Sequence, residues 1–208
     1  MKTILTSITI ALGLSCIAIA PVSAETIAQS KQFGVAPPAC EEDTQLYLNI
    51  CASRWAKTAD FLRSLIYDEV NSRIPEARKT QLKAIEQTWN SYRDIHCEEL
   101  SAPFRKGSIY SLLYFSCRAR VTNDRIADLQ GTNISKITSD LTTQRLAKIL
   151  KHEKMENSAG QRQWLQYQAQ HCQFESVRST ETLRSVKQCR DRLGEGRLKE
   201  LEALLRIR

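Results

Sequence analysis

The chain has 208 residues and a formal net charge of +7, from 30 Lys and Arg against 23 Asp and Glu. The basic residues are spread along the chain rather than gathered in blocks, which argues against nucleic acid as a partner. Apart from the N-terminal stretch, no apolar run approaches the ~18 residues that a bilayer-spanning helix needs. Composition therefore predicts a mature chain with no transmembrane segment and no nucleic-acid partner.

The N-terminus has the features of a secretory signal peptide. Lys2 precedes an uncharged, mostly apolar run over residues 4–20, and a small-residue cleavage site follows the run. We interpret residues 1–24 as a signal peptide that is removed on export. A lipoprotein anchored through Cys16 is the alternative, which we favour less because the residues before this cysteine make a poor lipid-attachment box. Residues 25–39 contain glycine and proline and have no apolar period, so they are predicted as a flexible leader.

Apolar residues at steps of three and four predict helices from there on. The first helix starts at Asp43 or Thr44 and ends before Pro75, because proline pushes the preceding residue out of the helical region. The second helix carries on one stripe Leu82, Ile85, Trp89, Tyr92 and His96. The third is expected to begin at a Ser108 cap and to end at Gly131.

A Ser/Thr-rich linker over residues 131–139 precedes a shorter set of helices. These helices are predicted at about 141–154, 164–172, 183–189 and 198–205, with breaks at Gly160, Gly194 and Gly196. No alternating apolar pattern of useful length occurs. The predicted fold class is therefore all-α, with two small disulfide-stapled helical units in tandem, residues 40–130 and residues 140–208.

A spaced motif occurs twice and indicates an internal duplication. The motif Trp-x-x-Tyr-x-x-x-His-Cys appears as Trp89, Tyr92, His96 and Cys97 and as Trp164, Tyr167, His171 and Cys172. Each copy is followed by Cys-Arg-x6-Arg-x3-Leu, as Cys117, Arg118, Arg125 and Leu129 and as Cys189, Arg190, Arg197 and Leu201. Two of the three tryptophans open the motif. We therefore predict that the second unit is a degenerate copy of the first.

Of the seven cysteines, Cys16 leaves with the signal peptide and the others suit an oxidising compartment. If the two copies fold alike, their equivalent cysteines pair in the same way. The repeat then predicts the disulfides Cys40–Cys51, Cys97–Cys117 and Cys172–Cys189. A competing arrangement, Cys51 with Cys97 and Cys40 with Cys117, stays open because the start of the first helix should adjoin the end of the second.

The side chains suited to acid–base chemistry or metal binding form no known catalytic motif. Asp94, His96, Glu98 and Glu99 lie near a helix end, which favours solvated or ion-paired groups over catalysis. His96-Cys97 and His171-Cys172 are interpreted as packed histidines and disulfide sulfurs rather than zinc ligands, because neighbouring helical residues diverge by ~100°. We predict a protein that is not an enzyme and that holds no cofactor and no metal.

A compound pattern spans residues 40–129. It consists of Ala59-Asp60-x6-Tyr67, Leu82-x6-Trp89-x-x-Tyr92-Arg93-Asp94-x-x-Cys97, Gly107-Ser108-Ile109 and Cys117-x4-Thr122-x2-Arg125-x3-Leu129. In these residues the chain resembles the LprI-like lysozyme inhibitor family of exported bacterial proteins, N-terminal domain type. It departs from the family at Arg63-Ser64, where Leu-Asn is usual. The second copy lacks the Arg-Asp pair after Tyr167 and the Gly-Ser-Ile loop, so the resemblance implies the family's activity for the first unit only.

The resemblance implies an exported protein that binds and occludes a muramidase in the cell envelope, with lysozyme as the protein partner. The predicted partner-binding residues are Arg105, Lys106, Gly107, Ser108, Ile109 and Arg118. Arg93 is expected to pair internally with Asp94, whereas the roles of Arg118, Arg120 and Arg125 stay open between internal pairing and contact with a partner's carboxylates. The alternative function is a non-enzymatic envelope module that binds a protein partner or an anionic polymer. The sequence leaves the oligomeric state open.

Overall fold

The computed structural model describes residues 34–131, 139–177 and 182–205. These residues fall within a single unit, residues 32–208, and form helices without any strand in the described ranges. The prediction of an all-α fold is therefore confirmed. None of the described helices is both long enough and apolar enough to cross a membrane. The predicted signal peptide lies outside the described residues.

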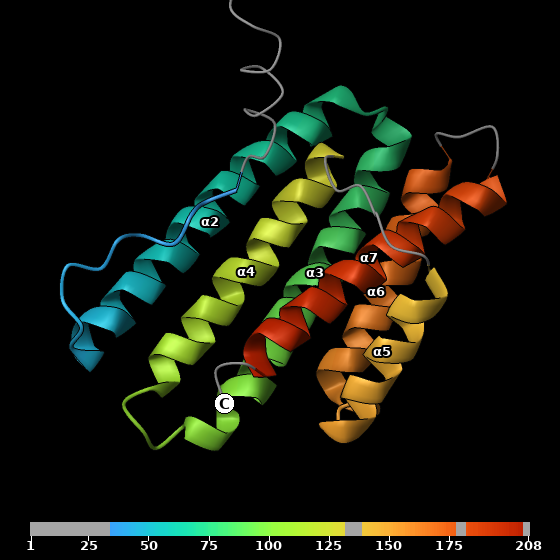
Figure 1. Ribbon diagram of the computed structural model, residues 1–208. Coiled ribbons are helices and arrows are strands. Elements are labelled where there is room, and N and C mark those ends of the chain that lie inside the picture. Colours follow the sequence, from blue (N-terminus) through green and yellow to red (C-terminus); the bar gives the residue numbers. More distant parts are fainter. Residues whose placement is uncertain (1–33, 132–138, 178–181, 206–208) are drawn as a thin grey trace, which may run out of the picture. The chain divides into compact units, whose positions relative to one another are not determined.

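Three long helices and one short 3-10 helix make up the N-terminal half of the described chain. They are α2 (Gln45–Arg73), α3 (Glu76–Ser101), η1 (Ala102–Phe104) and α4 (Tyr110–Gln130). α2 packs along α4, and α4 packs against α3 (Figure 1). Thr44 caps α2 by accepting a hydrogen bond from the Tyr47 N–H at 3.3 Å, and α2 ends just before Pro75. Gly131 ends α4 in the left-handed region, at φ 67°, which glycine adopts without steric cost. These helix boundaries confirm the sequence prediction.

The C-terminal half consists of α5 (Ser139–His152), α6 (Ala159–Ser176) and α7 (Thr182–Leu205). α5 and α6 both pack against α7, and α6 also packs against α3. The predicted breaks at Gly194 and Gly196 are wrong, because α7 continues through both glycines. Glycine in a helix interior costs about 1 kcal/mol relative to alanine. Burial of Leu193, Arg197 and Leu198 on the same helix outweighs that cost.

Ser108 also differs from its predicted role as a helix cap. α4 starts at Tyr110, and its N-cap residue, Ile109, makes no side-chain hydrogen bond. Ser108 lies in the turn before the helix, where its carbonyl accepts a hydrogen bond from Nδ2 of Asn49 at 2.9 Å. Ser108 therefore contacts α2 through its backbone carbonyl and does not cap α4.

The last residues of the predicted flexible leader are held against α2 and α4. The carbonyl of Val35 accepts hydrogen bonds from Nε1 of Trp55 at 2.6 Å and from Nδ2 of Asn123 at 3.0 Å. The N–H of Val35 donates to Oδ1 of Asn123 at 2.8 Å. Residues 34–39 are therefore part of the fold, whereas the rest of the predicted leader lies outside the described residues.

The cysteines pair as the repeat predicts. The Cα atoms lie 6.2 Å apart in Cys40–Cys51, 5.6 Å apart in Cys97–Cys117 and 5.5 Å apart in Cys172–Cys189. All three separations fall within the range of roughly 4.4–6.8 Å that a disulfide allows. One bridge joins α3 to α4 and its counterpart joins α6 to α7. The competing pairing of Cys51 with Cys97 does not occur.

Buried side chains of the two halves form a common hydrophobic cluster. Members of this cluster are Leu82, Ile85, Trp89, Tyr92 and Val121 from the first half and Leu146, Trp164, Tyr167, Phe174, Leu193 and Leu201 from the second. Because α3 packs against α6, each half covers apolar surface of the other. The division into tandem units at residues 131–139 stays a prediction, and the shared core shows that buried contacts cross this boundary.

We expect thiol titration of the denatured, non-reduced mature protein to detect no free thiol, because all six cysteines outside the signal peptide are paired. Replacing Cys97 and Cys117 together by serine should lower the free energy of unfolding by about 3 kcal/mol, the chain-entropy effect of closing a loop of this length. Urea denaturation measures that change. Two reactive thiols per wild-type chain would contradict the pairing.

Candidate functional site

The loop that the sequence predicts as partner-binding, residues 105–109, connects η1 to α4 and has an exposed middle. On one side, Arg105 pairs with Glu98 of α3, and the Tyr110 hydroxyl donates to the same carboxylate at 2.6 Å. These hydrogen bonds hold the pKa of Glu98 below its usual value. On the other side, Asn49 of α2 donates to the loop backbone. The loop is therefore held between two helices while its tip stays exposed.

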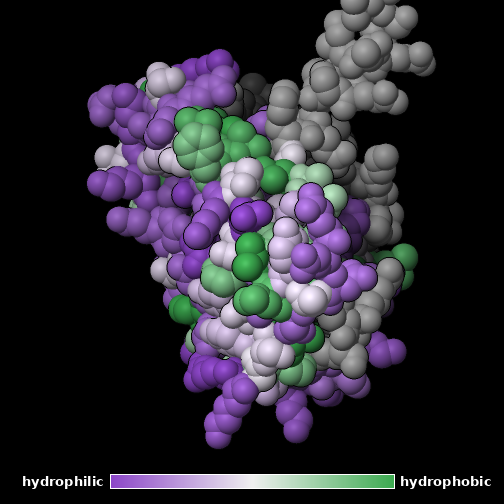
Figure 2. Space-filling model, turned by 90° about the vertical axis from the view of Figure 1, so that its left-hand side faces the viewer, coloured by the Kyte–Doolittle hydropathy of each residue, from purple (hydrophilic) through white to green (hydrophobic). Residues whose placement is uncertain are grey.

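Large exposed apolar side chains occur at two separate places along α2. They are Leu46, Ile50, Phe61 and Leu65, with exposed fractions of 71%, 38%, 67% and 51%. Figure 2 faces this side of the molecule and shows hydrophobic side chains in separate patches among hydrophilic ones. Leu46 and Ile50 share the first turns of α2 with Asn49, which contacts the loop. Two exposed apolar side chains thus lie on the helix turns from which Asn49 contacts the predicted binding loop.

Arg118 lies away from the exposed surface of the loop, in a cluster of ion pairs between α2, α3 and α4. Its guanidinium is 3.3 Å from Asp60 and 3.3 Å from Asp94, and its side chain is only 20% exposed. Arg93 pairs with the same two carboxylates, at 2.6 Å from Asp60 and 2.9 Å from Asp94. The expected pairing of Arg93 with Asp94 is present. The ion pairs of Arg118 join α2, α3 and α4. The exposed loop residues are therefore better candidates for partner contact than Arg118.

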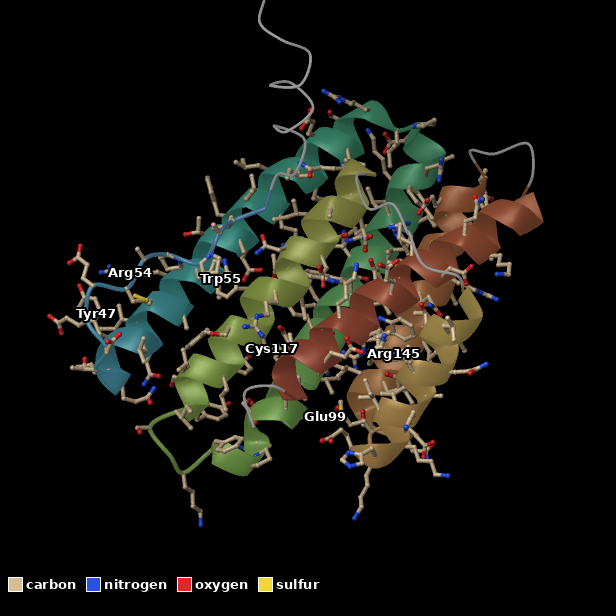
Figure 3. All side chains as sticks on the ribbon, in the orientation of Figure 1. Tyr47, Arg54, Trp55, Glu99, Cys117 and Arg145 are labelled. Atoms are coloured by element: carbon tan, nitrogen blue, oxygen red, sulfur yellow. A yellow bond between two sulfur atoms is a disulfide. The ribbon has the colours of Figure 1, made fainter. Side chains whose placement is uncertain are left out.

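The four acid–base residues near the end of α3 each have a different partner. Asp94 joins the Arg118 cluster, Glu98 holds the loop, and His96 contacts α7. Both carboxylate oxygens of Glu99 accept from the N–H of Gly160 at 3.1 Å, near the start of α6 (Figure 3), where the helix dipole favours an acid. A Cβ on Gly160 would come within 2.6 Å of Glu99 and 3.0 Å of the Cα of His96. The close approach of α6 to α3 therefore requires glycine, and the four residues do not converge on one site.

A buried polar network connects α3 to α7. Nη1 of Arg197 donates to the Tyr92 hydroxyl at 2.9 Å and to Glu200 at 2.8 Å. Glu200 also lies 2.5 Å from Nε2 of His96 and 3.1 Å from the Tyr92 hydroxyl. Both ring nitrogens of His96 also face Arg197: Nδ1 lies 3.2 Å from Nη2 and Nε2 lies 2.7 Å from Nη1, which favours a neutral imidazole that can accept from the guanidinium. Burial and the neighbouring Arg197 lower the pKa of His96, which agrees with the neutral form.

A second network connects α4 to α6. In this network the arginine and the acid come from the N-terminal half and the tyrosine and histidine come from the C-terminal half, which is the opposite of the first network. Arg125 donates to the Tyr167 hydroxyl at 3.0 Å and to Nδ1 of His171 at 3.1 Å. The Tyr167 hydroxyl donates to Asp128 at 2.9 Å, as Tyr92 does to Glu200 in the other network. Arg125 is fully buried and also pairs with Glu86 of α3. Residues that the repeat places in equivalent positions thus make equivalent contacts.

Each network uses an arginine and an acid from one half and a tyrosine and a histidine from the other. The repeated motif identified the arginines, tyrosines and histidines, but gave no signal that their contacts cross between the halves. The arginines are paired with carboxylates, and the carboxylates accept hydrogen bonds from buried donors. Their arrangement therefore holds the two halves together and offers no reactive group.

Two groups of metal-ligand type occur in the part of the chain that the structure describes. Ligand atoms of His96, Cys117 and Glu200 lie within 4.8 Å of one another, and so do those of His171, Glu175 and Cys189. Both cysteines are in disulfides and therefore present no thiolate to a metal. We assign no metal to either group.

The protein is all-α and its helices are joined by disulfides. Within the described residues, its candidate site is an exposed binding loop rather than a catalytic motif. Residues 38–129 match the model of a protein family described as Lysozyme inhibitor LprI. This match confirms the resemblance that the sequence shows over residues 40–129. It ends before the second half, so the degenerate copy rests on the motif spacing and on the reciprocal contacts. Comparisons with curated proteins and with solved structures found no match.

Proposed function

We propose that the protein inhibits a lysozyme in the bacterial envelope by placing residues 105–109 and the first turns of α2 against the cleft of the enzyme. The supporting observation is an exposed loop, held by Glu98 and Asn49, beside the apolar side chains of Leu46 and Ile50. This surface lies within the segment that matches the inhibitor family. A compact apolar anchor with a polar rim suits an enzyme cleft, whereas a continuous basic face would suit an anionic polymer.

Local charge at the loop supports the same proposal. The cleft of a muramidase carries a pair of catalytic carboxylates. Lys106 is exposed on the loop, and the side chain of Arg105 is 64% exposed although it pairs with Glu98. Such cations form charge-assisted hydrogen bonds with carboxylates. Removal of the predicted signal peptide with Lys2 lowers the net charge from +7 to +6, which still opposes long-range attraction to a basic lysozyme, so these local contacts must supply the affinity.

The proposed location rests on the same observations. Disulfides and the family match are consistent with a location outside the cytoplasm. We infer export to the periplasm or the medium through the predicted signal peptide, residues 1–24. Inhibition at that location would protect peptidoglycan without any catalytic step by this protein.

We expect Lys106→Glu to weaken inhibition by about tenfold, because it places a carboxylate against the carboxylates of the cleft. Turbidity clearing of bacterial cells by lysozyme, titrated with the full mature protein, measures the effect. Lys148→Glu is the matched control: Lys148 is exposed on α5, and its replacement changes the net charge equally. We expect the control to inhibit like the wild type.

Two outcomes would contradict this proposal. Equal losses in both variants would mean that only net charge matters and that the loop does not make the contact. If the wild-type protein fails to slow lysis at micromolar concentration, the alternative of a non-enzymatic envelope module replaces inhibition. Retention of the protein on purified peptidoglycan or teichoic acid would then support the polymer-binding form of that alternative.

A further inference from the structure

A cavity of about 370 Å³ lies between α4 and α7, away from the loop at residues 105–109. Four aromatic residues from α3 and α6 contribute to its lining, namely Trp89, Tyr92, Trp164 and Tyr167. Charged side chains from α4 and α7 line the rest. A volume of this size, with aromatic walls and a few polar groups, is typical of small-molecule sites.

Most of the charged residues around the cavity already have partners within the protein. The pairs are Arg125 with Glu86, Arg192 with Asp128, Arg197 with Glu200, and Lys199 with Glu195. Arg120 and Asp124 remain, and neither makes an ion pair or a hydrogen bond with the described residues. Nη1 of Arg120 is buried without a hydrogen-bond partner. Both residues line the cavity and stand one helical turn apart on α4.

The internal repeat explains why Arg120 has no ion-pair partner among the described residues. Counted from the paired cysteines, its equivalent in the second half is Arg192, which binds both Asp128 and Glu175 at 2.5 Å. The residue equivalent to Glu175 is Leu100, so one acceptor is absent on the side of Arg120. The residue equivalent to Asp124 is Gly196, and a Cβ built there meets nothing within 4 Å. The cavity thus forms where the two copies differ.

We propose that this cavity binds a small zwitterion, a free α-amino acid or a dipeptide. Its carboxylate accepts hydrogen bonds from Arg120, its ammonium group pairs with Asp124, and its side chain packs against the aromatic lining. An unpaired buried guanidinium donor is costly, and a carboxylate satisfies it with a charge-assisted hydrogen bond. Asp124 lies one helical turn from Arg120, and burial together with the carboxylates of Glu200 and Asp128 raises the pKa of its carboxyl; a bound ammonium group offsets that repulsion and favours the charged carboxylate. This site is independent of lysozyme inhibition and uses none of the loop residues.

Calorimetric titration of the full mature protein tests the ligand chemistry. Phenylalanine and alanyl-alanine are the two probes, and they distinguish a free amino acid from a dipeptide. N-acetylphenylalanine lacks the ammonium group and phenylalaninamide lacks the carboxylate, so each should bind at least about tenfold more weakly than phenylalanine. The N-acetyl and amide derivatives of alanyl-alanine provide the same two controls for the dipeptide probe. If neither zwitterion binds at millimolar concentration, or if derivatives bind as well as their parents, the proposal is overturned.

Substitutions locate the binding. Gly196→Trp should abolish it by filling the cavity, whereas Gly196→Ala, with open space for its methyl group, should leave it intact. Arg120→Met should weaken binding of the carboxylate probes by about tenfold, and Arg54→Met, on the exposed side of α2, should not. If Gly196→Trp fails to fold by circular dichroism, the comparison of Arg120→Met with Arg54→Met decides. Unchanged binding in Arg120→Met would place the ligand elsewhere and refute the proposed site.

Discussion

Replacing Arg197 by methionine is expected to lower the free energy of unfolding by about 3–5 kcal/mol, the range for breaking a buried ion pair by removing one partner. Arg197 is fully buried, and its guanidinium binds Glu200, Tyr92 and His96. Without it, the carboxylate of Glu200 stays in the interior with no cation to compensate its charge. Urea denaturation followed by circular dichroism measures the change. Because Arg197 reaches from the C-terminal to the N-terminal half, we expect one cooperative transition rather than two.

A surface pair provides the control for this experiment. Arg145 of α5 pairs with Glu202, and its side chain is 62% exposed (Figure 3). Exposed ion pairs contribute roughly 0–1 kcal/mol, so Arg145→Met should change stability little. The double variant with Arg197→Met and Glu200→Gln should recover part of the loss, because it removes the uncompensated charge. Equal stability of the two single arginine variants would show that the network does not hold the halves together.

Stability is expected to fall steadily as the pH is lowered from neutral to about 2. Burial alone would raise the pKa of Glu200, but His96 and Arg197 together outweigh burial and lower it from 4.5 to about 2. A carboxyl with a depressed folded-state pKa stabilises the fold fully above its unfolded value and loses this contribution as the pH falls through the folded value. The shift corresponds to about 3 kcal/mol between pH 4.5 and 2.

The two buried histidines also lower the stability as the pH falls, but at a higher pH than Glu200 does. Burial is the main cause that lowers the pKa of His96 and of His171 below 6.5. The unfolded chain therefore binds protons that the folded chain does not, and stability declines as the pH falls below 6.5. Denaturation midpoints measured at several pH values test both contributions. Glu200→Gln should flatten the profile below pH 4.5, and a wild-type stability that rises from pH 6.5 to 5 would contradict the assignment of neutral histidines.

Helix positions were predictable where the signal was local. Thr44 and Gly131 mark their helix ends through cap and left-handed backbone chemistry, and Pro75 stops a helix for steric reasons. The helix breaks predicted at Gly194 and Gly196 were wrong, because the low helix propensity of glycine has a smaller effect than the burial of neighbouring side chains. The exposed loop at residues 105–109 was also recognisable from sequence, whereas the inward position of Arg118 was not. A charged residue on a helix reveals neither its partner nor its depth.

The sequence alone determined the features that depend on residues close together or regularly spaced. These include the all-α class, the repeated motif with its disulfide pairs, and the segment that matches the inhibitor family. Tertiary structure decided the reciprocal networks and the cavity, because their contacts join residues far apart in the chain. Tyr92 and Arg197 stand 105 positions apart, and no local pattern relates them. Only the packing of α3 against α6, beside α4 and α7, brings such side chains within hydrogen-bond distance.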